Sequence, residues 1–232
     1  MELIEAILAN KNLHRAYKQV YANKGASGVD EITVEEVGLY LYQNKEEIKE
    51  QIRNRKYKPQ PVRRVEIPKE NGKMRKLGIP TVVDRVLQQA IVQVITPIFD
   101  VQFSEYSYGF RPNRNCEQAV IKALEYFNDG YDWIVDIDLQ SFFDEVNQDR
   151  LMNIISRTVG DGDVISLIRK FLQSGVMENG VLVKTEKGTP QGGNLSPLLS
   201  NIMLNELDKE LEARESYRCG SDFLMRKRCV FG

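Results

Sequence analysis

The stretch Asp132-Trp-Ile-Val-Asp-Ile-Asp-Leu-Gln-Ser-Phe-Phe-Asp144 decides how the rest of the chain is interpreted. Its first part is rich in β-branched residues punctuated by carboxylates, and we interpret residues 132–139 as a buried strand. Side chains two positions apart on a strand share a face, so Asp136 and Asp138 are expected to point the same way. The aromatic pair Phe142-Phe143 then leaves the strand end directly beside these carboxylates.

Two buried carboxylates on one face repel each other unless a cation or hydrogen-bond donors offset their charge. A divalent metal with oxygen ligands, such as Mg²⁺, is the usual solution. The alternative is that one aspartate caps a turn or forms a salt bridge while the other lies at an exposed strand end. The two phenylalanines are equally open to two interpretations, since they could line a nucleotide pocket or fill the core.

The charges are segregated, although the formal net charge is only −1. Residues 51–85 hold eleven basic residues against three acidic ones, a net of +8. Residues 129–149 hold seven acidic residues and no lysine or arginine, a net of −7. A phosphate-binding surface beside a carboxylate cluster is what metal-dependent chemistry on a polyphosphate or nucleic acid requires. Two ordinary solvated faces would give the same counts, so charge alone leaves both interpretations open.

The remaining pattern predicts a mixture of helices and short hairpins. A basic β-hairpin is expected from residues 62–68 and 73–79 around Asn71-Gly72, and a second one from residues 175–178 and 181–185 around Asn179-Gly180. The tail after residue 214 has no clear period, and we assign it no element. Apolar residues at helical spacing predict helices in the first 57 residues, including 34–52, and at 81–99, 117–127, 147–159, 164–172 and 196–214.

The 232 residues are 42% apolar, which is too apolar for a disordered chain and sufficient for a core without disulfides. Three scattered cysteines and a single histidine argue for a reducing compartment and against a structural zinc site. No stretch reaches the roughly 18 apolar residues of a membrane span, and the first eight residues carry two glutamates where a secretory signal would be basic. We therefore expect a cytoplasmic protein with no membrane partner.

Two loops are further candidates for binding. The loop Gly188-Thr-Pro-Gln-Gly-Gly-Asn194 lets its backbone approach a substrate closely while Gln191 supplies an amide, yet it lacks the Gly-Lys-Ser/Thr ending of a phosphate-binding P-loop. A tight strand-to-helix connection would look the same. The segment Tyr108-Gly-Phe-Arg-Pro112 could stack bases or pack a loop against the core. A lone histidine, His14, gives no support to triad chemistry.

Taken in order, these segments closely resemble the reverse transcriptases encoded by group II introns, also called intron maturases. The resemblance covers residues 1 to about 214, and it depends on the order and spacing of its motifs more than on any one of them. The motifs are Gly25-Ala-Ser-Gly-Val-Asp30, Val65-Glu-Ile-Pro-Lys69, Arg75-Lys-Leu-Gly-Ile-Pro-Thr81, Asp84-Arg85, Tyr108-Gly-Phe-Arg-Pro112, Val135-Asp-Ile-Asp-Leu-Gln-Ser-Phe-Phe-Asp144, Gly188-Thr-Pro-Gln-Gly-Gly-Asn-Leu-Ser-Pro197 and Asn201-Ile-Met-Leu-Asn-Glu-Leu-Asp208.

The resemblance implies an α+β right-hand polymerase fold with fingers and an incomplete palm. Fingers would occupy residues 1–130, a palm portion residues 131–214, and residues 215–232 would be an unassigned tail. The implied activity of the complete protein is RNA-directed DNA synthesis with Mg²⁺, in which a primer 3′-hydroxyl attacks the α-phosphate of a dNTP and pyrophosphate leaves. The implied partners are an RNA template with a DNA primer and dNTPs, together with the group II intron RNA whose splicing such proteins assist.

The resemblance also assigns roles to individual residues. Asp138 is similar to the metal-binding catalytic carboxylate, with Asp136 as its neighbour and Leu139 lending a backbone carbonyl to the metal. Phe143 looks like the residue that screens the sugar 2′ position. The nucleotide-binding set is completed by Lys69 and Arg75 for the triphosphate, Arg63 as a weaker candidate, and Gln191 for the base and template, and the expected RNA-binding set is Arg53, Arg55, Lys56, Lys58 and Arg64.

One departure limits these expectations. The family pattern calls for Tyr-x-Asp-Asp after Arg214, but the chain reads Arg218-Cys-Gly-Ser-Asp222 and no Tyr-x-Asp-Asp occurs anywhere. We assign Asp222 no catalytic role and expect no polymerase activity from this chain alone. The alternative function is a catalytically incomplete RNA-binding module that acts as a maturase or as a dimeric scaffold. Apolar surface left by missing palm strands would favour such a homodimer.

Overall fold

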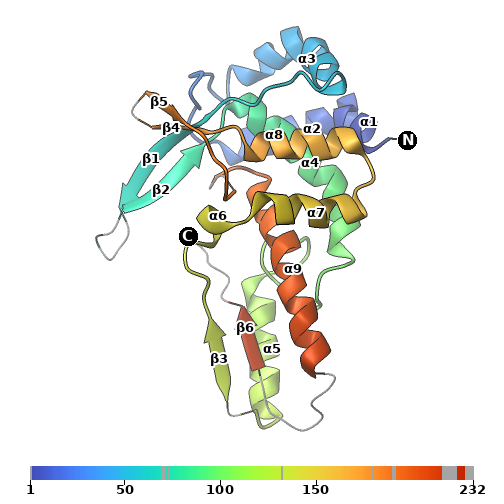
Figure 1. Cartoon of the computed structure of the whole chain (residues 1–232), viewed down its shortest axis with the longest axis vertical. Helices are drawn as coiled ribbons and strands as arrows, with labels where there is room; N and C mark the ends of the chain where they lie inside the picture. The colour runs from blue at the N-terminus through green and yellow to red at the C-terminus, as the bar shows by residue number, and fades with distance from the viewer. Residues whose placement is uncertain are drawn as a thin grey trace.

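The computed structural model describes residues 2–68, 72, 74–131, 133–178, 180–189, 192–215 and 224–227. Within this part, most helices gather in the upper half of the molecule, from which a basic hairpin projects, while α5 and much of α9 lie in the lower half (Figure 1). The helices are α1 (Leu3–Leu8), α2 (Asn10–Asn23), α3 (Val37–Arg53), α4 (Val82–Asp100), α5 (Cys116–Asn128), α6 (Phe142–Glu145), α7 (Gln148–Thr158), α8 (Gly162–Leu172) and α9 (Ser196–Glu215). The strands are β1 (Val62–Pro68), β2 (Met74–Ile79), β3 (Ile134–Ile137), β4 (Val176–Glu178), β5 (Val181–Val183) and β6 (Leu224–Lys227).

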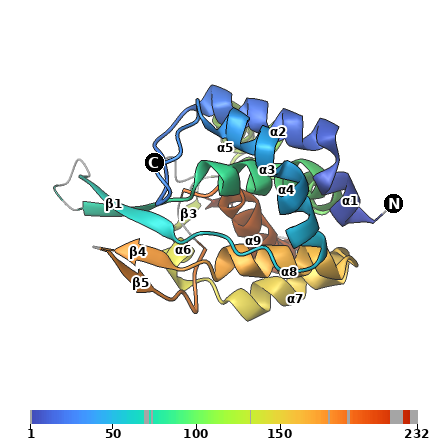
Figure 2. The same cartoon turned by 90° about the horizontal axis from the view of Figure 1, so that it is seen from above.

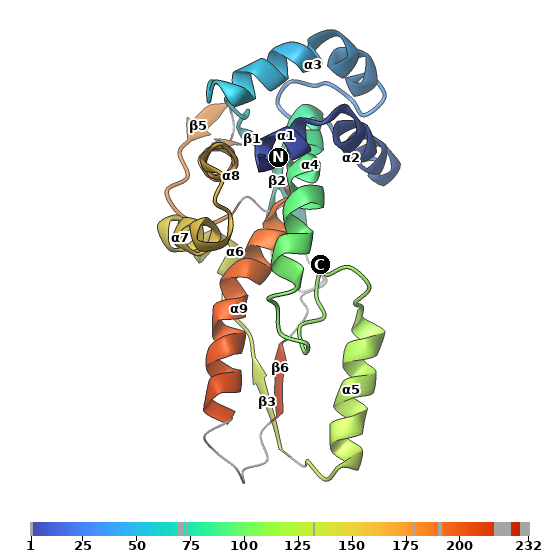
Figure 3. The same ribbon diagram turned by 90° about the vertical axis from the view of Figure 1, so that its right-hand side faces the viewer.

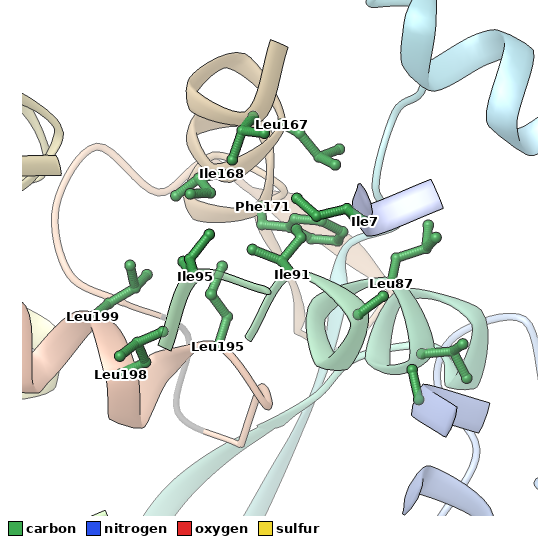
Figure 4. Close-up of a cluster of buried hydrophobic side chains, with 14 of the residues drawn as sticks. Ile7, Leu87, Ile91, Ile95, Leu167, Ile168, Phe171, Leu195, Leu198 and Leu199 are labelled. Atoms are coloured by element: carbon green, nitrogen blue, oxygen red, sulfur yellow. The ribbon is translucent and has the colours of Figure 1, made fainter. Parts of the chain in front are cut away.

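Helix α4 is the centre of the core. Its N-cap residue Thr81 accepts a hydrogen bond from the backbone N–H of Asp84, and its first turn is almost entirely buried. The sequence predicts a helix over 81–99, and the observed helix continues through Pro97 to Asp100, since a proline late in a helix removes only one backbone donor. Figure 4 shows apolar side chains from α1, α4, α8, α9 and the residue just before α9 converging here: Ile7, Leu87, Ile91, Ile95, Leu167, Ile168, Phe171, Leu195, Leu198 and Leu199.

By length and composition alone, α4 could cross a membrane, with a mean hydropathy of 1.2 over its apolar window. However, 61% of that window is buried inside the molecule. Burial of this extent is what the central helix of a packed core shows. The apolar sequence of α4 is therefore accounted for by the core in Figure 4.

Both expected hairpins are confirmed, and they join into one sheet with the strand order β2-β1-β4-β5. Strands β1 and β2 pair antiparallel, with Arg63 opposite Ile79 and Ile67 opposite Arg75. Strand β4 then pairs parallel to β1, with Val62 beside Val176. Seen from above in Figure 2, the β1–β2 hairpin extends away from the helices. Of its expected turn, Asn71 lies outside the described residues.

The expectation of a buried acidic strand is wrong. Strand β3 spans only four residues, and Ile134 and Ile137 are 48% and 38% exposed. Its strand partner in the described part of the chain is β6, which pairs with it in parallel. Helix α5, in the same half of the molecule, has no buried residue (Figure 3). An apolar strand is buried only where other layers cover it, and the described residues supply no such cover here.

Candidate functional site

The register of the β1–β2 hairpin sorts the predicted basic residues onto two faces. Residues directly opposite each other in an antiparallel pair share a face, so by the backbone register positions 63, 75 and 77 belong to one face, and the side chain of Arg75 itself lies outside what the structure describes. Arg64 and Lys76 lie on the other face, where Lys76 forms an ion pair of 3.3 Å with Glu178 of β4. This arrangement groups the two arginines proposed for the nucleotide and separates them from Arg64.

The glycine-rich loop lies directly against this hairpin. Gly192 has a φ of +106°, and a Cβ placed there would lie 2.3 Å from the carbonyl oxygen of Gly78 and 3.3 Å from Cδ1 of Leu77. Only a glycine allows so close a backbone approach. The loop therefore meets the hairpin beside the face that carries Arg63 and Arg75. Two predicted site residues, Lys69 and Gln191, lie outside the described residues.

The same loop is hydrogen-bonded to the turn that carries Phe143. The backbone N–H of Thr189 donates to the Phe143 carbonyl at 2.7 Å, and that of Gly188 donates to the Val146 carbonyl at 2.7 Å. Phe142 and Phe143 are partly buried, with ring centroids 5.7 Å apart in an edge-to-face arrangement. The structure thus brings three segments together that are distant in sequence: the basic hairpin, the aromatic turn at α6 and the glycine-rich loop.

The acidic strand contributes less than expected. Asp136, Asp138 and Leu139 are all exposed. Water can therefore stabilise the two aspartate carboxylates, which are not the buried like charges that would need a metal ion. In the part of the chain that the structure describes, no group of three or more His, Cys, Asp or Glu residues could hold a metal ion. Asp222 lies outside the described residues. The described residues alone therefore do not supply the donors of a complete metal centre.

A buried carboxylate, Asp84, anchors the base of the hairpin. It accepts hydrogen bonds from the Tyr57 hydroxyl at 2.7 Å, the Thr81 hydroxyl at 2.9 Å and the backbone N–H of Gln60 at 3.0 Å. Burial raises the pKa of Asp84 to about 6, and the hydrogen bonds from Tyr57 and Thr81 act in the opposite direction. These bonds tie the segment that enters β1 to the first turn of α4 and so fix where the hairpin leaves the core.

The segment around Arg111 is used for packing. Its guanidinium is almost fully buried, pairs with Asp100 at 2.8 Å and donates to the carbonyl oxygens of Ser104 and Ser107. Of the two interpretations left open by the sequence, the structure assigns Arg111 to holding the loop. Phe110, in contrast, is 58% exposed with a φ of +53°.

The predicted RNA-binding residues differ in how they are engaged. Arg53 forms a bidentate pair with Glu5 at 2.7 and 2.9 Å, and Arg55 pairs with Asp163 at 2.6 Å. Such exposed pairs are weak and can exchange for a phosphate. Lys56 and Lys58 are exposed and have no ion pair within the described residues, and Arg64 is half-buried.

A further basic surface on α2 was missed by counting charges in the hairpin region. Helix α2 contains no aspartate or glutamate, and it buries Asn12, Ala16 and Val20 against the core. The opposite side presents three exposed cations beside a pair of aromatic rings, Tyr17 and Tyr21, whose centroids lie 5.9 Å apart with their planes tilted at 47°. A helical projection of the sequence would have found it. We define the α2 cationic face as Lys11, Arg15, Lys18 and Tyr21.

The chain matches the family described as reverse transcriptase (RNA-dependent DNA polymerase) over residues 67–226. It is 42% identical over 200 residues to the group II intron-encoded protein LtrA of Lactococcus lactis, covering 84% of this chain and 32% of LtrA. It is 36% identical over 218 residues to the protein YkfC of Escherichia coli, covering 91% of this chain and 57% of YkfC. The chain thus spans about a third of the length of LtrA and over half that of YkfC.

Among solved structures, a partial Cas6-RT-Cas1–Cas2 complex superposes with a TM-score of 0.61 at 24% identity, covering 92% of this chain and 35% of that chain. That likeness concerns the fold. The family match also continues to residue 226, beyond the position near 214 where the sequence motifs stop. The first three residues of strand β6 (Leu224–Lys227), in the tail to which the sequence assigned no element, are therefore within the matched region.

Proposed function

This chain belongs to the reverse transcriptase family, among the proteins encoded by group II introns, and on that premise we propose that it carries a nucleotide-binding surface and an RNA-binding surface of such an enzyme. Because the chain spans only part of its relatives, RNA-directed DNA synthesis is proposed for the complete protein. Its substrates there are an RNA template, a DNA primer and dNTPs.

The observation that supports the nucleotide site is the contact of the glycine-rich loop with both the hairpin and the Phe143 turn. A dNTP between these segments would have its triphosphate near Arg63 and Arg75, with Lys69 from the hairpin tip. Phe143 would lie against the sugar, and Gln191 would contact the base. Guanidinium groups suit phosphate oxygens because their planar donors bind two oxygens at once.

Catalysis by this chain alone is not part of the proposal. Divalent metal ions are the cofactors that this family generally uses, and the resemblance names Asp138 and the Leu139 carbonyl as ligands. The described residues offer Asp136 and Asp138 without a third ligand residue. We therefore assign no metal-dependent step to this chain and expect no primer extension from it, even with Mg²⁺ supplied.

RNA binding is the activity that this chain could retain without a complete catalytic centre. Lys56, Lys58 and Arg64 surround the base of the hairpin, and the α2 cationic face adds a second basic surface. Neutralising phosphates with lysine and arginine releases counterions, so binding of this kind weakens steeply as salt rises. The proposed partner is the structured group II intron RNA, whose splicing the bound protein would assist.

The test is a salt-series titration of the full chain against a group II intron RNA and an unrelated RNA of the same length. We expect tighter binding to the intron RNA and a steep salt dependence. Lys56→Glu with Lys58→Glu should weaken binding to both RNAs, whereas Lys209→Glu, at an exposed position of α9, should not. Equal affinity for the two RNAs would contradict specific recognition of the intron RNA. Binding that does not change with salt would contradict phosphate binding by lysine and arginine.

A further inference from the structure

We propose that Gln148 is a positioning residue that holds the Phe143 turn and the glycine-rich loop at a fixed separation, and so sets how strictly the nucleotide site selects a 2′-deoxy sugar. The inference rests on the proposed nucleotide site. Its structural half, the coupling of the two segments, can be tested without any nucleotide.

Gln148 is the first residue of α7 and is only 4% exposed. Its side-chain Nε2 donates to the carbonyl oxygen of Gly188 at 3.0 Å and to that of Leu172 at 3.2 Å. An amide nitrogen has two hydrogens, so both are used. One buried side chain therefore connects the start of α7, the end of α8 and the glycine-rich loop.

The backbone around Gly188 is held on both sides. The N–H of Gly188 donates to the Val146 carbonyl at 2.7 Å. The carbonyl oxygen of Gly188 accepts from the side chain of Gln148, which lies two residues after Val146. The next N–H, of Thr189, donates to the Phe143 carbonyl at 2.7 Å. These three hydrogen bonds join residues 143–148 to residues 188–189. The position of Phe143 relative to the loop is thus fixed through its own carbonyl group.

The packing at this junction leaves no space for adjustment. Gly188 has a φ of +83°, and a Cβ there would lie 2.8 Å from the Phe143 carbonyl oxygen and 2.9 Å from that of Asp144. Both Gly188 and Thr189 are buried, so an unpaired carbonyl at Gly188 could not turn to water. Removing the Gln148 donor would therefore move the loop and the Phe143 turn relative to each other.

A second link crosses the same junction at the surface. Lys187 pairs with Glu145 at 2.7 Å, but both side chains are about three-fifths exposed, at 62% and 58%. An exposed ion pair constrains the relative position of two segments much less than a buried, hydrogen-bonded amide does. This pair supplies a matched control, since Lys187→Met removes a long polar side chain next to the junction without touching the buried hydrogen bonds.

The experiment compares the wild-type chain with Gln148→Met, which keeps the shape of the side chain but removes both donors, and with Lys187→Met. Hydrogen exchange is followed in peptides covering residues 142–147 and 186–189. In Gln148→Met we expect faster exchange in both peptides together, unchanged exchange in α4 and an unchanged circular dichroism spectrum. Exchange that stays as in wild type in both peptides would overturn the coupling.

The sugar selection is measured as the ratio of affinities for a fluorescent dNTP and the matching rNTP. In Gln148→Met the preference for the dNTP should fall by about fivefold, which corresponds to ~1 kcal/mol of lost discrimination between the two sugars. Lys187→Met should keep the wild-type ratio. Faster exchange with an unchanged ratio would overturn the selecting role. If the wild-type chain binds neither nucleotide, the proposed nucleotide site and the selecting role both fail, while the exchange result still decides the coupling.

Discussion

At the scale of single residues, Asp84 shows how burial makes folding depend on pH. Its pKa is raised from 3.8 to about 6, so the folded chain holds a proton over a range where the unfolded chain has released it. The stabilisation from this proton is fully present below pH ~3.8 and is lost as the pH rises through about 6, a change of up to about 3 kcal/mol.

The measurement is urea unfolding at intervals from pH 3.5 to 7 for the wild-type chain and for Asp84→Asn. The free energy of unfolding of the wild type should fall with rising pH relative to that of the variant, because asparagine does not titrate. Parallel curves across this range would show that the Asp84 carboxyl does not have a raised pKa.

Gly192 tests the contact between the loop and the hairpin. Alanine at this position would place a Cβ 2.3 Å from the Gly78 carbonyl oxygen at a φ of +106°, so the backbone of one segment must move. We expect Gly192→Ala to destabilise the chain by about 2 kcal/mol or more and to weaken dNTP binding. Gly160→Ala is the control, since nothing lies within 4 Å of a Cβ there. Similar melting temperatures for the two variants would contradict the close approach.

Individual site residues were only partly predictable from the sequence. The shared face of Arg63 and Arg75 follows from a hairpin register that a local Asn-Gly turn already indicates. The exposure of Asp136 and Asp138 could not be predicted from the sequence, because the burial of a strand depends on which layers cover it. The role of Gln148 was also out of reach, since its partners lie 24 and 40 residues further along the chain.

At the scale of elements, the α2 cationic face is the part whose function can be tested most directly. Replacing Lys11, Arg15 and Lys18 by glutamate should lower the affinity for RNA and reduce the magnitude of the salt slope by about two, because each lost phosphate contact removes ~0.7 to 0.9. Folding should persist, since all three side chains are exposed. Lys209→Glu serves as the reference for a single reversed charge. An unchanged salt slope in the triple variant would exclude α2 from the RNA-binding surface.

Elements with strong local signals were predicted and those that depend on distant partners were not. The helices other than the short α6, and both hairpins, follow from periodicity and turn residues, which act within a few positions. The parallel pairing of β1 with β4 joins segments about 114 residues apart, such as Val62 and Val176, and no local pattern encodes it. Strand β6 lacks an alternating pattern, and among the described residues its strand partner is the distant β3.

At the scale of the whole molecule, the two halves differ in how much apolar surface they bury. The upper half contains the continuous core of α1, α4, α8 and α9 (Figure 4). Helix α5 lies in the lower half (Figure 3), has no buried residue, and carries several apolar side chains that are about half exposed. These are Val120 at 49%, Ile121 at 50%, Leu124 at 55% and Phe127 at 46%.

Stability within a protein follows the local density of buried contacts, so these halves should open at different free energies. We expect amide hydrogens of α5 and β3 to exchange under native conditions well before those of α4 and α8, whose exchange should approach the free energy of global unfolding. Leu124→Glu, on the exposed side of α5, should change that global value by less than about 0.5 kcal/mol, whereas Ile91→Ala, which empties a fully buried position in α4, should lower it by about 2 to 5 kcal/mol. Equal protection in α5 and α4, together with a large effect of Leu124→Glu, would mean that α5 packs against other parts of the chain in solution.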